Sequence, residues 1–253
     1  MCTFEEVEDI LNLIILGGHM TRTLAIFGAG PVLGLSLARR FGREGFRIAL
    51  VARTTENLDA LVAELDADGI EASGFVADVY EPAQVEAAVT AIGRIDAVAF
   101  NPGGGTMGEG IVPVLDVDPE NLRLVLDQFL VSAVALVRAV LPDMTERGDG
   151  AILFTAGQSG LYPAPFLGNV GMAQAALRNY FHNLNAVLAE KGVYAGAVNV
   201  GALIEGSVPH QVLTSSPLDF EPEVIHPDVF ADAFWKLYAT RESPEALVGS
   251  FGR

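Results

Sequence analysis

The chain has 253 residues, 51% of them hydrophobic, which is enough to bury one large core and short enough for a single domain. Its 32 acidic and 15 basic side chains give a net charge of -17, which would repel nucleic acids and anionic membrane surfaces. Cys2 is the only cysteine, which excludes an intramolecular disulfide and fits a reducing cytoplasm. We therefore expect a cytoplasmic protein with no nucleic acid or membrane partner.

Residues 1–19 do not share the pattern of the rest of the chain. Their apolar run, Ile10–Leu16, is too short to span a bilayer, and the residues before it are acidic where a signal peptide needs positive charge. We expect an N-terminal appendage, either disordered or a short helix, followed by one domain over residues 20–253.

From Leu24 onward, short apolar runs alternate with longer amphipathic stretches, a pattern typical of βαβ units. The predicted strands are Leu24–Phe27, Ile48–Val51, Ala72–Val76, Ala97–Phe100, Ala151–Thr155 and Gly196–Val200. The predicted helices are Gly34–Glu44, Thr55–Asp68, Pro82–Ile92, Pro119–Arg147, Val170–Lys191 and Asp228–Thr240. Because the strands are apolar nearly throughout, we predict an α/β fold of the Rossmann type, a doubly wound, mostly parallel sheet of six to seven strands with helices on both faces.

Serines and prolines break residues 202–227 into loops and short pieces, which favours a lid or substrate loop. His210 would reach the site if this stretch closes over it, and the alternative is an ordinary surface histidine. The four histidines of the chain show no metal-ligand spacing, so no metal site is predicted.

A glycine turn, Gly28-Ala-Gly-Pro-Val-Leu-Gly34, directly follows the first predicted strand and opens the first helix. Backbone N–H groups and the helix dipole at such a position can hold a pyrophosphate, and Gly34 lets the helix approach the strand closely. The alternative is a tight turn without a ligand. The dinucleotide-binding residues predicted here are Gly28, Gly30, Val32, Leu33 and Gly34.

Arg53 and Thr54 follow the second strand, where an NAD site usually carries an acid for the ribose 2′-hydroxyl. Arg53 can pair with a 2′-phosphate, and Thr54 can donate a further hydrogen bond, so the sequence favours NADP(H) over NAD(H). The alternative for Arg53 is a solvated side chain at a helix start.

Polar and glycine-rich turns follow the third and fourth strands as well. Asp78 and Val79 follow the third predicted strand and could contact adenine. Asn101, Pro102 and Gly103 follow the fourth predicted strand, where the backbone could approach the ribose and nicotinamide. Each turn alone could be ordinary turn chemistry. Together they lie at the carboxyl ends of successive strands, which is the edge at which such sheets bind ligands.

With these features the sequence resembles the short-chain dehydrogenase/reductase family along nearly all of residues 22–205. The landmarks that carry the resemblance are the glycine turn, Arg53, Asp78-Val79, Asp96 to Gly103, Leu141-Pro-Asp-Met144, Ala175-Ala-Leu177 and Val198-Asn-Val-Gly201. The sequence departs from the family in two of them: Val32 replaces the central glycine of the turn, and Phe100-Asn-Pro-Gly103 replaces Asn-Asn-Ala-Gly. The resemblance implies a nicotinamide cofactor and a homodimer or homotetramer assembled through the fourth and fifth helices.

The family's chemistry rests on a tyrosine that protonates the carbonyl oxygen, a lysine four residues later that lowers the tyrosine pKa, a serine and an asparagine. The positions aligned with these four residues are, in that order, Val170, Gln174, Gly157 and Phe129. A shift of register does not restore the pair, because neither Lys191 nor Lys236, the only lysines, has a tyrosine four residues before it. The resemblance therefore does not extend to the usual proton relay.

Five nearby side chains are candidates for the missing roles. Tyr162 precedes the fifth predicted helix and could replace the tyrosine, although a loop aromatic at the rim is the alternative. Gln158, Ser159, Asn169 and Gln174 are neutral groups that can orient a substrate but have little acid or base strength. Gln174, at the lysine position, is also a candidate cofactor ligand.

Three functions are compatible with this pattern. The first is an atypical NADP(H)-dependent oxidoreductase acting on a small organic substrate, such as an iminium, that needs no proton from the enzyme. The second is a non-redox enzyme that cyclises, dehydrates or isomerises its substrate on the same scaffold. The third is a cofactor-binding partner without chemistry.

Overall fold

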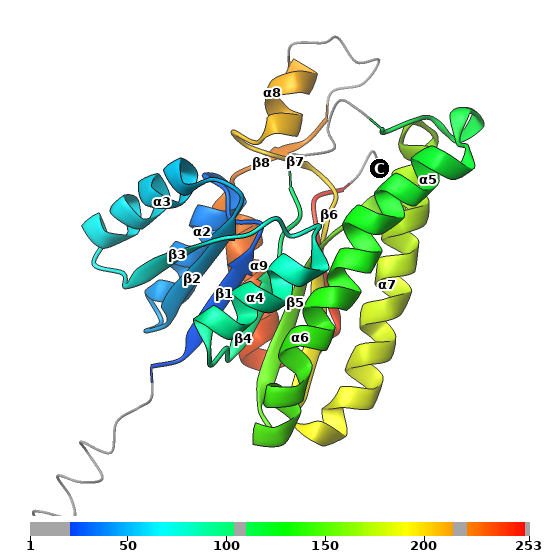
Figure 1. Ribbon diagram of the computed structural model, residues 1–253. Coiled ribbons are helices and arrows are strands. Elements are labelled where there is room, and N and C mark those ends of the chain that lie inside the picture. The colour runs from blue at the N-terminus through cyan, green and yellow to red at the C-terminus, as the bar shows by residue number, and fades with distance from the viewer. Residues whose placement is uncertain (1–20, 104–109, 215–221, 251–253) are drawn as a thin grey trace, which may run out of the picture.

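The computed structural model describes residues 21–103, 110–214 and 222–250 (Figure 1). Its main sheet has seven parallel strands in the order β3-β2-β1-β4-β5-β6-β9. Their bounds are Thr23–Phe27 (β1), Arg47–Ala52 (β2), Ala72–Val76 (β3), Ala97–Phe100 (β4), Gly150–Gly157 (β5), Val193–Val200 (β6) and Glu245–Val248 (β9). This order, which reverses beside β1, confirms the predicted doubly wound α/β fold.

Helices cover both faces of the sheet (Figure 1). One face carries α2 (Leu33–Gly42), α3 (Thr55–Ala67) and α9 (Pro227–Thr240). The other carries α4 (Pro82–Ile92), α6 (Ser132–Arg147) and α7 (Gly168–Leu188), with α5 (Pro119–Leu126) leading into α6. Each face therefore has its own apolar core.

The strands alternate their side chains between the two cores. Leu24 and Ile26 of β1 belong to the core under α2 and α9, whereas Ala25 and Phe27 belong to the core under α4 and α6. All four are fully buried, as expected for a central strand of a parallel sheet. This two-sided packing fixes the strand ends at which the candidate site residues lie.

The helix predicted over 119–147 contains a π turn, Asp127–Val131, between α5 and α6. Such turns insert one extra residue and are common at functional sites. This 29-residue helix is the one in the described ranges that is long and apolar enough, by length and composition, to cross a membrane. Core helices pass the same test, and this one packs beside α4 and α7.

The described parts of residues 202–227, which are 202–214 and 222–227, form loops and short elements, as predicted. They contain β7 (Leu203–Ile204), α8 (Val208–Thr214) and β8 (Val224–Ile225), and β7 pairs with β8 in a small second sheet. β9 was also outside the predicted strands. The predicted appendage, residues 1–19, lies outside the described residues, and lid closure stays a prediction.

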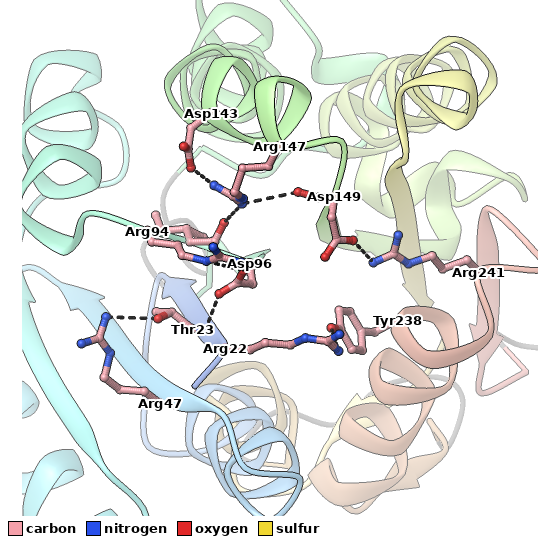
Figure 2. Close-up of polar contacts among 11 residues, drawn as sticks. Arg22, Thr23, Arg47, Arg94, Asp96, Asp143, Arg147, Asp149, Tyr238 and Arg241 are labelled. Carbon is pink, nitrogen blue, oxygen red and sulfur yellow. Dashed lines mark hydrogen bonds and ion pairs between the residues drawn. The ribbon is translucent and has the colours of Figure 1, made fainter. Parts of the chain in front are cut away.

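The amino ends of the strands are closed by a network of charged side chains, shown in Figure 2. The buried Asp96 accepts a hydrogen bond from the backbone N–H of Thr23 at 2.9 Å and pairs with Arg94 at 2.7 Å. Nearby, Arg241 pairs with Asp149 at 3.0 Å. These contacts tie the amino ends of neighbouring elements together. The candidate site residues lie at the opposite, carboxyl edge of the sheet.

Candidate active site

The glycine turn connects the end of β1 to the start of α2. The N–H groups of Gly28 and Ala29 both donate to the carbonyl oxygen of Val51, at 3.0 and 2.9 Å, which fastens the turn to β2. Gly28 has a φ of +90°, and a Cβ there would lie 2.2 Å from the carbonyl oxygen of Asn101. A Cβ at Gly34 would lie 3.1 Å from the Ala29 Cα. Both glycines are therefore explained by the turn itself, with or without a ligand.

The start of α2 and Gly30 are compatible with a ligand at this turn. The helix begins at Leu33, its N-cap residue Val32 makes no side-chain capping bond, and its first turn has no acidic residue. Its first backbone bond to the turn is from Leu35 to Gly30, which leaves the N–H groups of Leu33 and Gly34 without a backbone acceptor among the described residues. A Cβ at Gly30 would meet no atom within 4 Å. Open space in front of free N–H donors fits a pyrophosphate.

Arg53 and Thr54 lie beside this turn, at the start of α3. Arg53 is exposed and takes part in no ion pair of the described residues. Thr54 is the N-cap of α3, and its hydroxyl makes no capping bond. Asn57, in the first turn of α3, donates from Nδ2 to the carbonyl oxygen of Ala29 at 3.0 Å, so the segment that carries Arg53 is fastened to the glycine turn. Asn57 was not predicted, although its place one helical turn after Arg53 was a usable signal.

The turn after β3 lies next to Arg53 because the N–H of Ala77 donates to the carbonyl oxygen of Ala52 at 2.9 Å. The Asp78 carboxylate accepts a hydrogen bond from the N–H of Tyr80 at 3.0 Å, and this contact shapes the turn. Val79 is buried in the core. Of the two predicted residues, Asp78 is partly exposed and holds the turn, whereas Val79 packs in the core.

Asn101 ties three strand ends together. Its backbone N–H donates to the carbonyl oxygen of Phe27 at 2.8 Å, and its side-chain Nδ2 donates to that of Gly28 at 3.3 Å. Its Oδ1 accepts a hydrogen bond from the hydroxyl of Thr155 at 3.1 Å. Thr155 was missed as a site residue by the sequence analysis, although it lies near the carboxyl end of β5, the strand next to β4. The side chain of Asn101 thus holds the site's backbone in place.

An apolar cluster contains Val170 and Phe129, the residues that the sequence analysis aligned with the family's tyrosine and asparagine. Val170 is 8% exposed and lies with Val125 and Ala173 in a small core, and Phe129, from the π turn, packs against it. The Ser132 hydroxyl donates to the carbonyl oxygen of Asp127 at 2.7 Å and so satisfies an acceptor of the π turn. Among the described residues of this cluster there is no acidic or basic side chain.

A neutral amide occupies the lysine position. Gln174 is 5% exposed, and its Oε1 accepts a hydrogen bond from the backbone N–H of Gly157 at 2.9 Å. A Cβ at Gly157, the serine position, would lie 3.5 Å from the Gln174 Cγ, so the glutamine side chain packs directly against this glycine. No hydrogen bond from Nε2 of Gln174 is found within the described residues, which leaves that group as a donor for a ligand.

A family model described as short chain dehydrogenase matches residues 22–208. The chain belongs to this family. Dehydrogenase/reductase SDR family member 4 of Sus scrofa is 27% identical over 179 residues, a match that covers 68% of this chain and 62% of that protein. The chain thus matches about three fifths of the length of this curated relative.

Two solved short-chain dehydrogenase structures show how fully the fold is shared. A single-residue variant of the actinorhodin polyketide ketoreductase, solved with NADPH, has a TM-score of 0.80 at 24% identity, covering 92% of this chain and 98% of that one. A short chain oxidoreductase of Pseudomonas aeruginosa PAO1, described as containing an atypical catalytic center, has a TM-score of 0.79 at 21% identity, covering 91% and 96%.

Two of the predicted substitutes for the short-chain dehydrogenase relay are engaged in structural bonds. Gln158 is 1% exposed, and its Nε2 donates to the carbonyl oxygen of Gly249 at 2.9 Å. Asn169 is fully buried; its Oδ1 accepts from the N–H of Val112 at 3.1 Å, and its Nδ2 donates to the carbonyl oxygen of Gly110 at 2.5 Å. Both side chains therefore hold loops in place and cannot turn towards a substrate without breaking these contacts.

The other two candidates lie differently. Ser159 is partly exposed and lies against Gly171 of α7, where a Cβ would be 3.2 Å from its carbonyl oxygen. Tyr162 lies near Arg178, one helical turn beyond Gln174. The hydrogen bond that Arg178 donates to Glu245 is the main cause that raises the pKa of Arg178, and the Tyr162 phenol adds to it. A Cβ at Gly157 would lie 3.4 Å from the Ser159 Oγ, so Ser159 stays beside the position predicted for the serine.

The segment predicted as a lid does approach the glycine turn. A Cβ at Gly206, between β7 and α8, would lie 3.7 Å from Cγ2 of Val32. His210 of α8 accepts a hydrogen bond at Nδ1 from the N–H of Gly206 at 3.0 Å. The residue that replaces the family's central glycine is therefore in contact distance of the segment carrying His210.

Proposed function

We propose that this protein is an NADP(H)-dependent oxidoreductase that works without a tyrosine–lysine proton relay. The observation that carries the proposal is the combination of a complete strand-edge nucleotide cradle with an apolar cluster at the tyrosine and asparagine positions. Such a cradle would bind a nucleotide, whereas the residues aligned with the usual relay offer no group that could donate a proton to the substrate.

The cofactor would be held by residues that follow β1 and β2 and by one residue of α7. The N–H groups of Leu33 and Gly34 would bind the pyrophosphate, Arg53 and Thr54 would bind the 2′-phosphate, and Nε2 of Gln174 would take the place of the lysine at the nicotinamide ribose. The actinorhodin ketoreductase, which shares the fold, carries NADPH in its structure. These residues are the basis for preferring NADP(H) to NAD(H).

The substrate that suits this site best is a protonated imine, and the bound nicotinamide would supply the hydride to its carbon. An iminium carbon is already positive, so its reduction generates no oxyanion and requires no proton from Val170 or Gln174. The apolar side chains of Phe129 and Val170 exclude water that would hydrolyse the iminium. The net charge of -17 attracts a cationic substrate to the protein.

Two measurements test the proposal. NADP⁺, NADPH and NAD⁺ are titrated in thermal-shift experiments, where we expect stabilisation by the NADP pair at lower concentration than by NAD⁺. The absorbance of NADPH is then followed with panels of cyclic imines and ketones, and loss of absorbance is expected with imines only. The absence of any thermal shift would refute the proposed cofactor binding, and inactivity towards both panels would refute the proposed reductase activity.

The joint replacement of all four relay positions also favours a second candidate, a cofactor-binding protein without redox turnover. This protein and a non-redox enzyme both predict tight nucleotide binding with no consumption of NADPH. The thermal-shift titration together with the absorbance assay therefore separates these two candidates from the reductase.

We further propose that the protein assembles as a homo-oligomer through the outer faces of α5, α6 and α7. Leu124 and Val131, seven residues apart, are 42% and 47% exposed, and Met172 and Val187 of α7 are 43% and 62% exposed. Exposed apolar stripes of this kind mark association surfaces. Replacing Val131 by glutamate should lower the molar mass measured by light scattering, and an unchanged mass would exclude this face.

A further inference from the structure

Two loops at the carboxyl edge of the sheet meet at the start of α7. One lies between β4 and α5 and contains Ile111, and the other follows β5 and ends in a short 3₁₀ helix, η4 (Pro165–Leu167). The N–H of Gly168 donates to the carbonyl oxygen of Val112 at 2.9 Å, and a Cβ at Gly168 would lie only 2.5 Å from the Val114 Cα. The two loops are therefore packed backbone against backbone.

Asn169 fixes this junction from within. It is fully buried, its Oδ1 accepts from the N–H of Val112 at 3.1 Å, and its Nδ2 donates to the carbonyl oxygens of Gly110 and Asn121 at 2.5 and 3.2 Å. Since all three partners are backbone groups, the loop that carries Ile111 is held to both α5 and α7, which lie side by side (Figure 1). A surface built on such a loop is formed before any ligand binds, so little ordering opposes binding there.

The side chains at this junction are apolar. Ile111 and Leu167, one from each loop, pack against the cluster that contains Val170, and Phe129 joins it from the π turn. Ile111, Phe129 and Leu167 are each only partly buried, and we call these three side chains the apolar wall. An apolar surface thus continues from Val170, the residue aligned with the family's tyrosine, onto both loops.

The apolar wall suits an apolar group of a substrate. Its three side chains have no hydrogen-bonding group, so a hydroxylated or charged substituent covering them would lose its contacts with water without replacement. An apolar substituent would instead remove apolar surface from water on both sides of the contact. Because the wall begins at Val170, such a substituent would be attached at the reacting carbon or next to it.

We propose that the substrate carries a bulky apolar substituent, such as a cyclic alkyl group or an aryl ring, on its imine carbon, and that the apolar wall selects it. The inference rests on the proposed function, which places the reacting carbon beside Val170, and it narrows the substrate class to substituted imines. A second copy of the chain is a poorer occupant, because the wall is continuous with Val170, whereas the proposed association face carries other side chains, Leu124 and Val131.

The first test compares the reduction of 2-methyl-1-pyrroline and 2-cyclohexyl-1-pyrroline, which differ only in the alkyl group on the imine carbon. We expect kcat/KM to be about tenfold or more higher for the cyclohexyl compound. Ile111→Thr replaces an ethyl group of the wall by a hydroxyl and should lower this preference about fivefold. Val62→Thr is the matched control, since Val62 is a partly buried, β-branched residue of α3 on the opposite face of the sheet, and it should keep the preference.

The second test needs no turnover. Binding of the two corresponding amines, 2-methylpyrrolidine and 2-cyclohexylpyrrolidine, is measured by calorimetry in excess NADP⁺, and the cyclohexyl amine should bind about tenfold more tightly to the unmodified protein than to Ile111→Thr it does by a clearly smaller factor. A preference in binding without consumption of NADPH would refute the proposed reductase and still support the apolar wall. The two failures are therefore distinguishable.

Three results would overturn the inference. They are equal affinities of the two amines, a preference that Ile111→Thr leaves unchanged, and a lowered molar mass of Ile111→Thr in light scattering with neither amine bound, which would assign the wall to a contact between copies. Thermal unfolding checks that the variants fold. Ile111→Val, which removes a single methyl group, repeats both tests with a smaller expected loss of preference, about twofold, should the threonine variant not fold.

Discussion

Replacing Gly30 by aspartate should weaken nucleotide binding about thirtyfold without unfolding the protein. A Cβ at this position meets no atom within 4 Å, and Gly30 is not among the glycines with positive φ, so the backbone accepts a side chain. The new carboxylate would stand in the space in front of the α2 N-terminus that the proposal assigns to the nucleotide phosphates. Gly30→Asn is the control, because asparagine has nearly the same shape without the charge.

The magnitude follows from the charge. Two unit charges ~8 Å apart, at an effective dielectric constant of about 20, repel by about 2 kcal/mol, which weakens binding about thirtyfold. Calorimetry with NADP⁺ should therefore show a loss of this order for Gly30→Asp beyond any loss in Gly30→Asn, while the free energy of unfolding changes by less than about 0.5 kcal/mol in both. Equal affinities of the two variants would refute the assignment of this space to the phosphates.

Three further predictions concern the framework of the site. Gly28→Ala should destabilise the fold by about 2 kcal/mol or more, measured by urea unfolding, since its Cβ would clash with the carbonyl oxygen of Asn101 at a positive φ. Burial is the largest single influence and acts to raise the pKa of Glu245, but the hydrogen bonds and charges of Arg178 and His182 together outweigh it and hold the pKa below its usual 4.5. The folded state is thus stabilised above that pH and loses the contribution as pH falls through the lowered pKa, so the Tm of Glu245→Gln should vary less than that of the unmodified protein on acidification. Asn169→Ala should cost about 2–4 kcal/mol of stability, because it leaves several buried backbone groups unpaired.

The order of strands and helices was predictable because it depends on local patterns. Runs such as Ala97–Phe100 are apolar throughout, and the turns that follow β1, β2 and β4 contain the residue types that such turns require. The strand β9 was not predictable in the same way. Its four residues begin with Glu245, whose charge argues against a buried strand, and the pairing with Arg178 from a distant helix supplies the compensation.

The direction of side chains limited the prediction of the site. Gln158 and Asn169 lie within a few residues of the serine and tyrosine positions, yet both are turned into the structure to bond backbone groups from segments up to 91 residues away. Nothing in the local sequence shows this orientation. The contact of Phe129 with the Val170 cluster likewise joins the π turn to α7, and the helical pattern over 119–147 does not indicate a π turn.

The replaced relay residues fit one another in a way that single reversions would disturb. A lysine at Gln174 would lose the hydrogen bond to the N–H of Gly157 and leave a buried donor unpaired, at a cost of about 1–3 kcal/mol, and its ammonium would face the cluster of Val170 and Phe129 instead of a tyrosine hydroxyl. A tyrosine at Val170 would have to enter that same cluster, where overpacking costs about 1–3 kcal/mol. Val170 and Phe129 therefore form an apolar cluster, and Gln174 adds one neutral amide beside it. Such a surface suits a reaction in which the positive charge arrives with the substrate, and it opposes one in which a negative charge must form at the enzyme.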